Sequence, residues 1–280
     1  MRRGKEQKTV WVTGASSGLG LHTTLALRDA GWRVIAGARS FGEGKSIEGV
    51  SCLPLDVTSE ESVLAFCEAA RQLSDRVDAV VQCVGMLVLG SCEETLTEEY
   101  ARVMNTNYLG MVRVNRRVLP ILRAQGGGRL VLFSSINGLM GIPFQSAYTA
   151  SKHAIEGYAE CLQMETEPYG IQVTLIEPGD HRSGSDAYRP HASGMNERSP
   201  YAAAYDAAVN VIHHDETHGS DPDVLGRKVV RLLESRRAPF RRRIASPDQH
   251  LAVILHTVLP ARWNAWILRR YYGRREVGKQ

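Results

Sequence analysis

The stretch Thr13-Gly14-Ala15-Ser16-Ser17-Gly18-Leu19-Gly20 decides the fold, because it joins a short apolar run, Thr9–Thr13, to a helical pattern. Glycine lets the backbone turn tightly and approach a phosphate, while the first turn of the following helix offers unpaired N–H groups. Ordinary loops also collect glycine, so the position between a first strand and a helix carries the argument. The stretch predicts a loop that binds a nucleotide pyrophosphate through Gly14, Ser16, Ser17, Gly18, Leu19 and Gly20.

Short apolar runs alternate with longer helical patterns along the rest of the chain. The runs are rich in Val, Ile and Leu, as expected for strands that helices cover on both faces: Thr9–Thr13, Arg33–Ala38, Ser51–Leu55, Ala79–Cys83, Arg129–Ser134 and Gln172–Glu177. The amphipathic stretches between them are Gly18–Ala30, Ser59–Ser74, Glu98–Arg123 and Ala147–Glu167. This alternation predicts an α/β fold of the doubly wound Rossmann type with a parallel sheet.

The composition is ordinary for a soluble globular protein. The 280 residues are 43% hydrophobic and 23% charged, and one large domain can hold them all. No apolar run approaches the ~18 residues of a spanning helix, and the basic start of the chain does not resemble a signal peptide. The five cysteines lack metal-ligand spacing, which predicts reduced, buried thiols, no metal site and a cytoplasmic location without a transmembrane segment.

Positive charge is concentrated at the C-terminal end of the chain. From Gly226 onward there are 14 Lys and Arg against three Asp and Glu, although the net charge of the whole chain is only +4. Such a segment could attract an anionic substrate, a membrane surface or nucleic acid, or could form a solvated basic face. No nucleic-acid-binding module is recognisable, which favours the solvated face and predicts no nucleic-acid partner.

The end of the second predicted strand bears on which nicotinamide nucleotide the chain would bind. An acidic residue at this place bonds the adenosine 2′-hydroxyl of NAD, whereas the 2′-phosphate of NADP prefers an arginine. The strand ends Gly37-Ala38-Arg39-Ser40, with an arginine and no carboxylate. Unless Arg39 is only a solvated loop residue, the pattern favours NADP(H) over NAD(H).

Tyr148 and Lys152 form an i, i+4 pair, which places them one turn apart on the same face of a helix. A phenol has an ordinary pKa of ~10, and a neighbouring ammonium lowers that pKa by stabilising the phenolate. Ser135 directly follows the Arg129–Ser134 run, at the sheet edge where parallel sheets bind ligands. The three side chains together predict acid–base catalysis at a substrate oxygen.

These motifs, together with others in the same order, resemble the short-chain dehydrogenase/reductase family over nearly the whole chain. Leu55-Asp56-Val57 resembles the segment that holds the adenine ring, Asn107-Tyr-Leu-Gly110 resembles the NxxG segment, and Pro178-Gly179 resembles the PG motif beside the nicotinamide. The resemblance implies about seven strands in the order 3-2-1-4-5-6-7. It also implies cofactor contacts at Asp56, Val57, Cys83, Val84, Gly85, Tyr148, Lys152, Pro178 and Gly179.

Two segments depart from the family pattern. The family has Asn-Asn-Ala-Gly after the fourth strand, and this chain has Gln82-Cys83-Val84-Gly85. The family's asparagine steadies the central sheet, so we expect Cys83 to weaken that support without changing the chemistry. After Pro178-Gly179 the chain lacks a threonine that often contacts the carboxamide, and Ser183 is the candidate to replace it.

The resemblance implies an NADP(H)-dependent oxidoreductase that interconverts a ketone or aldehyde with an alcohol by hydride transfer. In reduction, Tyr148 would protonate the carbonyl oxygen and Ser135 would orient it. Lys152 would hold the nicotinamide ribose and lower the pKa of Tyr148, and Asn107 would hold a water of a proton relay. The alternatives are an NAD-using variant, an epimerase or dehydratase with the same Tyr–Lys pair, and a catalytically silent cofactor-binding regulator. Silent relatives usually lose the tyrosine or the lysine, and this chain keeps both.

The chain is predicted to form one domain over residues 1–280, with a substrate lid at about 180–220 and C-terminal helices at about 247–272. Apolar residues that follow the strands favour a hydrophobic carbonyl substrate: Val88, Leu89, Leu139, Met140, Ile142, Pro143 and Phe144. The later segments resemble 17β-hydroxysteroid and retinol dehydrogenases, which points the same way. Arg182, Arg189 and His191 keep a substrate with a carboxylate or phosphate open, such as an acyl thioester.

The expected assembly is a homo-oligomer, a dimer or a tetramer. The Glu98–Arg123 and Ala147–Glu167 stretches carry apolar residues on more than one face, and the matching helices form subunit interfaces in the family. The C-terminal helices could instead cover this apolar surface.

Overall fold

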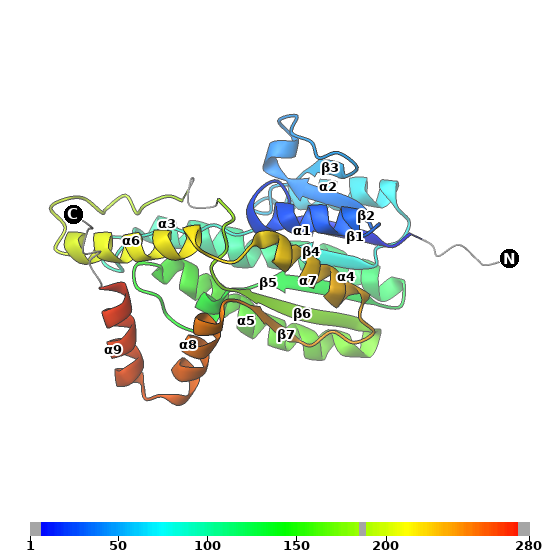
Figure 1. The fold of residues 1–280 in the computed structure, drawn as a ribbon. Helices are drawn as coiled ribbons and strands as arrows, with labels where there is room; N and C mark the ends of the chain where they lie inside the picture. The colour runs from blue at the N-terminus through cyan, green and yellow to red at the C-terminus, as the bar shows by residue number, and fades with distance from the viewer. Residues whose placement is uncertain (1–6, 185–188, 274–280) are drawn as a thin grey trace.

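The computed structural model describes residues 7–184 and 189–273, and they form one seven-stranded parallel sheet in the order β3-β2-β1-β4-β5-β6-β7 (Figure 1). The strands are β1 (Thr9–Thr13), β2 (Arg33–Ala38), β3 (Ser51–Pro54), β4 (Ala79–Gln82), β5 (Gly128–Phe133), β6 (Ile171–Pro178) and β7 (Arg241–Ile244). This arrangement confirms the predicted doubly wound α/β fold, its strand order and six of its strands to within one or two residues at each end. The prediction of a single domain over the whole chain stays a prediction.

Helices cover the sheet on both faces because successive strand residues point to opposite sides. Trp11 and Val80 pack on one face with α2 (Glu60–Leu73), α4 (Gly110–Ala124) and α5 (Ser146–Thr166). Val10 and Val12 pack on the other face with α1 (Gly18–Asp29) and α7 (Pro222–Glu234). Both faces are therefore apolar, which explains why the strands read as continuous hydrophobic runs.

The remaining helices gather beyond the carboxyl ends of the strands, at the end of the sheet that lies opposite the N-terminus (Figure 1). They are α3 (Thr97–Met104), α6 (Ala202–Thr217), α8 (Pro247–Val258) and α9 (Ala261–Tyr272), and short 3₁₀ turns occur at Arg39–Phe41, Ile136–Gly138 and Glu167–Tyr169. The predicted lid thus contains a regular helix, α6, while residues 185–188 of that lid lie outside the described part of the chain. The prediction of a helix pair with Pro260 between its members agrees with α8 and α9.

Two elements differ from the expectation. The stretch Glu98–Arg123 was predicted as one helix, but a π-helical turn over Asn105–Leu109 separates α3 from α4. The residue patterns also missed β7, whose sequence Arg-Arg-Arg-Ile does not read as a strand. Arg241 pairs with Glu156, Glu160 and Glu177, and Arg243 also reaches Glu177, so carboxylates of α5 and β6 hold this strand on the sheet edge.

Candidate active site

The glycine loop forms a cradle made of main chain between β1 and α1. Gly14 has a φ of +74°, and a Cβ atom on it would lie 2.8 Å from the backbone nitrogen of Val84. A Cβ atom on Gly20 would lie 2.1 Å from the carbonyl oxygen of Gly14. Side chains are thus excluded at both positions, and the bare backbone at the N-terminus of α1 suits close approach by a pyrophosphate. Ser16, Ser17, Gly18 and Leu19 complete this turn, as the sequence predicted.

Arg39 lies exposed at the end of β2, next to the Asp56 segment that follows β3. Burial acts to raise the pKa of Asp56, but the amide and hydroxyl of Thr58, together with Arg39 and Arg113, hold this pKa below its ordinary value. Thr58 donates to one Asp56 carboxylate oxygen from its amide at 2.9 Å and from its hydroxyl at 2.7 Å. The carboxylate is therefore ionised and fixed beside Arg39, at the predicted place for the adenosine.

Ser135 and Tyr148 meet at the carboxyl edge of β5. Ser135 caps the 3₁₀ turn after this strand, and its hydroxyl accepts a hydrogen bond from the Asn137 amide at 3.2 Å. Burial raises the pKa of Tyr148 to about 12, although a hydrogen bond with Ser135 and the charge of Arg189 act to lower it. The phenol is consequently protonated at neutral pH, in the form that can donate a proton.

Lys152 lies one turn after Tyr148 on α5, as predicted. Its Nζ lies 5.4 Å from the centroid of the Tyr148 ring and donates a hydrogen bond of 2.8 Å to the Phe133 carbonyl. Burial lowers the pKa of Lys152 to about 8, although Cys83 and Glu156 act to raise it. Burial dominates the pKa of Tyr148 in this structure, and the Lys152 ammonium donates to the Phe133 carbonyl, so the lowering of the Tyr148 pKa by Lys152 stays a prediction.

Asn107 is buried in the π-helical turn between α3 and α4. Its side-chain amide donates to the Met86 carbonyl and to the Ser151 hydroxyl, both at 2.9 Å, and its oxygen accepts from the Met86 amide at 2.8 Å. Ser151 in turn donates to the Tyr148 carbonyl at 2.7 Å. Asn107 therefore ties the loop after β4 to the helix that carries Tyr148 and Lys152.

The other predicted cofactor residues lie around this edge. Gly85 is close to Lys152, since a Cβ atom on Gly85 would lie 3.7 Å from its Nζ. Gly179 follows β6 directly, and its amide donates to the Ile244 carbonyl at 3.0 Å. Val57 differs, because its side chain is buried in the core and packs on Gly110, which leaves its backbone for any contact with a nucleotide. Cys83 contributes backbone as well, donating from its amide to the Thr13 carbonyl at 3.0 Å.

The model of the short chain dehydrogenase family matches residues 8–192, which include every residue of the site described above except Ile244. The chain belongs to the short-chain dehydrogenase family. This short-chain dehydrogenase is accordingly an oxidoreductase with a nucleotide-binding Rossmann fold.

The chain aligns with similar proteins over nearly the whole length of both sequences. It is 33% identical to a 3-ketodihydrosphingosine reductase of Bacteroides thetaiotaomicron, over 96% of this chain and 99% of the relative. A short-chain dehydrogenase from Streptomyces avermitilis has 28% identity and a TM-score of 0.76, covering 91% of this chain and 93% of the other. A short chain dehydrogenase/reductase from Burkholderia phymatum in complex with NAD has 22% identity and a TM-score of 0.77, covering 90% and 93%, which is a likeness of fold.

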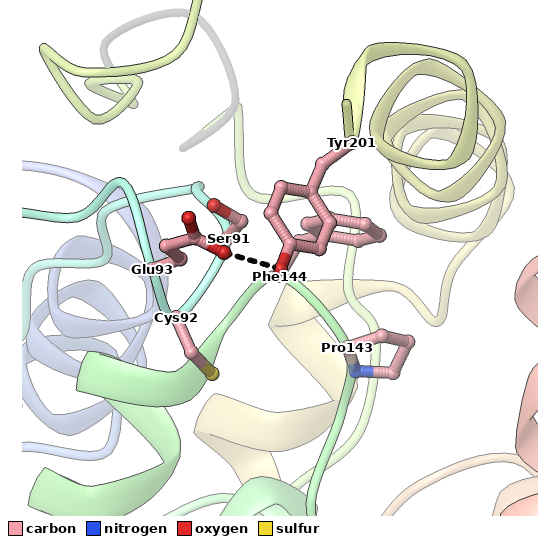
Figure 2. Close-up of a pocket in the computed structure, with 6 residues that line it drawn as sticks. All are labelled: Ser91, Cys92, Glu93, Pro143, Phe144 and Tyr201. Atoms are coloured by element: carbon pink, nitrogen blue, oxygen red, sulfur yellow. Dashed lines mark hydrogen bonds between the residues drawn. The ribbon is translucent and has the colours of Figure 1, made fainter. Parts of the chain in front are cut away.

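This short-chain dehydrogenase has a pocket of about 530 Å³ (Figure 2), and its lining residues do not include Ser135, Tyr148 or Lys152. Its surface is mostly apolar, and its lining comes from the loop after β4, the loop before α5 and the start of α6: Ser91, Cys92, Glu93, Pro143, Phe144 and Tyr201. Figure 2 shows Tyr201 pointing across toward Glu93, to which its hydroxyl donates at 2.6 Å. Phe144 has a φ of +60°, an uncommon conformation for a bulky residue, and it packs edge-on against Tyr205 at 5.4 Å.

Only some of the apolar residues that were predicted to line the substrate pocket line this one. Pro143 and Phe144 line it, but Val88 and Leu89 are buried in small core clusters. The other predicted lining residues of the loop after β5 pack against α8 and α9 instead: Leu139, Met140 and Ile142. These five residues therefore pack in the protein interior instead of lining the pocket: α8 and α9 cover the three after β5, while Val88 and Leu89 belong to clusters with α5 and α6.

The predicted anion-binding side chains are also engaged. Arg189 forms an ion pair of 2.7 Å with Glu216 of α6, and His191 hydrogen-bonds to the Tyr205 hydroxyl. The charge of Arg189 is thus largely neutralised, which weakens the case for an anionic substrate. Arg182 is exposed, and Ser183 as the replacement for the carboxamide-binding threonine stays a prediction.

Sequence reasoning missed two carboxylates near Tyr148, Asp180 after β6 and Glu216 on α6. Both act to raise the pKa of Tyr148. The pKa of Asp180 is itself raised to about 7, chiefly by burial and then by Glu216 and Asp215. Asp180 was visible only as part of a polar loop, and nothing in the residue pattern indicated that α6 would return to this edge.

The five cysteines are free, but the prediction that they are buried was wrong for several of them. Cys67 is buried, and burial raises its pKa to about 11. Cys52 and Cys83 are half-buried, while Cys92 and Cys161 are exposed. Exposure of Cys92 places one thiol at the mouth of the pocket.

Proposed function

We propose that the chain is an NADPH-dependent reductase of an apolar ketone, with Tyr148 as the proton donor. The observation that carries the proposal is the meeting of Ser135, Tyr148 and Lys152 at the carboxyl edge of β5. In reduction the Tyr148 phenol is the proton donor, and burial, which raises its pKa, keeps it in the protonated form that this step requires.

Each side chain has a separate task in this proposal. The Ser135 hydroxyl orients the carbonyl oxygen, and the Tyr148 phenol gives it a proton as the alcohol forms. Lys152, which is close to Gly85, holds the ribose next to the nicotinamide. The nicotinamide supplies the hydride when bound. Because both N–H groups of the Asn107 amide are already used, a relay water would have to bind an oxygen of Asn107.

The main-chain cradle supports a dinucleotide, since Gly14 and Gly20 leave space that a Cβ atom would fill. Arg39 at the end of β2 supports the phosphorylated form, because its guanidinium can pair with a 2′-phosphate. No acid takes the position that would bond a 2′-hydroxyl. An Arg39→Ala variant should therefore lose most of its preference for NADPH, and an unchanged ratio of NADPH to NADH affinities would refute this assignment.

The substrate class is proposed from the pocket and from a relative. Phe144 and Pro143 offer an apolar surface that binds by area removed from water. The Bacteroides relative is named for a keto group on a long-chain lipid, which fits such a surface. A long-chain keto lipid is accordingly the substrate to test first, with steroids, aromatic ketones, acyl thioesters and sugars for comparison.

The decisive experiment compares Tyr148→Phe with the native chain. We expect the variant to keep NADPH affinity while losing at least about 100-fold in turnover, because general-acid catalysis is removed. Tyr169→Phe is the matched control, since this tyrosine is exposed in the 3₁₀ turn that follows α5 and should be silent. Full turnover by Tyr148→Phe would favour the cofactor-binding regulator, as would the absence of turnover with every ketone tested.

A homodimer through α4 and α5 is part of the proposal. Met164 is 68% exposed on α5, and Leu109 is 42% exposed just before α4. Light scattering should give about twice the chain mass of 30.9 kDa, and a monomer at micromolar concentration would contradict it. A cytoplasmic location stays a prediction.

A further inference from the structure

Helices α8 and α9 form a hairpin with a row of exposed apolar side chains on each helix. On α8, Leu251, Ile254 and Val258 are 53–69% exposed, and their spacing places them on one face. On α9, Trp263 and Trp266 are at least half exposed and lie edge to face at 6.4 Å. Two neighbouring exposed tryptophans are unusual on a water-facing surface, because each carries a large apolar area.

Arginines accompany the tryptophans on α9. Arg262, Arg269 and Arg270 are exposed, and the Arg270 guanidinium lies 5.7 Å from the Trp266 ring centroid. Asp248 in the first turn of α8 is the one acid of the two helices, and the sequence has no Asp or Glu between Gln249 and Arg275, so the arginines of α9 have no acid on their own helix. We call these eight side chains the hairpin surface: Leu251, Ile254, Val258, Arg262, Trp263, Trp266, Arg269 and Arg270.

The opposite side of the hairpin is fixed to the protein. Val253, Leu268 and Tyr272 pack against the loop after β5. Asn264 is buried where the two helices meet, and its amide donates to the carbonyls of His256 at 2.9 Å and Leu259 at 3.1 Å. The hairpin surface is therefore held in a defined place at the end of the sheet that carries the candidate active site (Figure 1).

We propose that the hairpin surface docks on the anionic face of a lipid bilayer. Tryptophans settle at the level of lipid headgroups, arginines pair with anionic headgroups, and the aliphatic side chains enter the acyl boundary. The chain would lie on the bilayer, since no helix in the described residues is long and apolar enough to cross one. A second copy of the chain fits less well, because a symmetric contact would bring the arginines of two hairpins together without an acid between them.

Docking stands apart from the proposed reaction, because it depends on the outer side of the hairpin alone. It would bring the loop after β5, which packs against the inner side of α8 and α9, to within one helix layer of the lipid. Pro143 and Phe144 of the same loop line the pocket, so docking would turn this end of the protein toward compounds dissolved in the bilayer.

The test is binding of the full chain to vesicles of phosphatidylglycerol and of phosphatidylcholine, measured by co-sedimentation. We expect binding to the anionic vesicles only, weakened about fivefold for each arginine changed to glutamine. Trp263→Ser with Trp266→Ser should lose binding by at least about tenfold. Leu73→Ser at the end of α2 is the matched control, since this residue is 43% exposed and lies outside both the hairpin and the proposed dimer interface. The thermal unfolding midpoint checks that each variant is folded.

Tryptophan fluorescence gives a second readout without any change to the chain. Trp11 is fully buried and Trp32 is 6% exposed, so a blue shift on adding vesicles must come from the hairpin surface. Equal binding by the hairpin variants and the control would overturn the proposal. An absence of binding to anionic vesicles would also overturn it. If, in addition, the tryptophan variant converted an oligomer to a monomer, the hairpin surface would be assigned to contact with a second copy of the chain. All of these readouts are independent of turnover.

Discussion

Gly20→Ala is the sharpest test of the cofactor cradle. The new Cβ atom would lie 2.1 Å from the Gly14 carbonyl oxygen and 3.1 Å from the Cys83 Cβ atom. Real contacts of this kind stay beyond about 3 Å, so the loop and the start of α1 must separate by roughly 1 Å. Gly14 cannot yield easily, because its amide donates to the Gly37 carbonyl at 2.9 Å and its Cα faces the backbone of Val84.

Two losses follow from that displacement. Overpacking of this size costs about 1–3 kcal/mol of the free energy of unfolding. The N–H groups of the loop move by a similar distance, which should weaken NADPH binding by at least about tenfold. Calorimetric titration measures the affinity, and chemical unfolding measures the stability.

Gly157→Ala on α5 is the control, because its Cβ atom would meet nothing within 4 Å. It should raise stability by roughly 0.5–1 kcal/mol and leave the affinity for NADPH unchanged. If Gly20→Ala bound NADPH as tightly as the native chain, the main-chain cradle would not be the pyrophosphate site.

Three further outcomes are expected. Because burial lowers the pKa of Lys152 to about 8, its ammonium is lost as the pH rises through that value, and turnover with saturating NADPH should fall there; a flat profile to pH 10 would show that the charge is dispensable. Gln82→Leu should lower the free energy of unfolding by about 1–3 kcal/mol in denaturant, since Gln82 donates at 2.6 Å to a buried Asn115 oxygen that would lose its donor; an unchanged midpoint would exclude this role. Phe144→Ser should raise the KM for apolar ketones roughly tenfold but not for acetone, whereas equal effects on both would place Phe144 outside the substrate pocket.

The sequence was informative where the determinants of structure are local. The glycine loop and the Tyr148–Lys152 spacing each depend on a few consecutive residues, so they could be read directly. The expectation that Cys83 weakens the central sheet stays a prediction, and it overlooked a link made by the preceding residue. Gln82, its neighbour, donates to Asn115, which donates to the Tyr158 hydroxyl at 3.1 Å, and this chain links β4 to α4 and α5.

The features that escaped prediction depend on residues far apart in the sequence. Strand β7 forms because Arg241 and Arg243 meet carboxylates on α5 and β6, and no local pattern signals that pairing. The pKa of Tyr148 depends on burial and on carboxylates that the segment after β6 brings back. Phe144 has a positive φ that its own side chain disfavours, so only the surrounding structure could reveal it.

The π-helical turn at Asn105–Leu109 corrects the phase of a long helix. The first and last of the buried residues Val103, Asn107, Met111, Val114, Val118 and Leu122 are 19 residues apart, whereas five regular turns advance the chain by about 18 residues. The wider turn absorbs the additional residue, so the stripe of α4 that packs on the sheet continues into the buried side of α3, which packs on Val88 and Ala192. Deleting a single residue from this turn would therefore rotate α4 by about 100° about its axis and expose its apolar face to solvent.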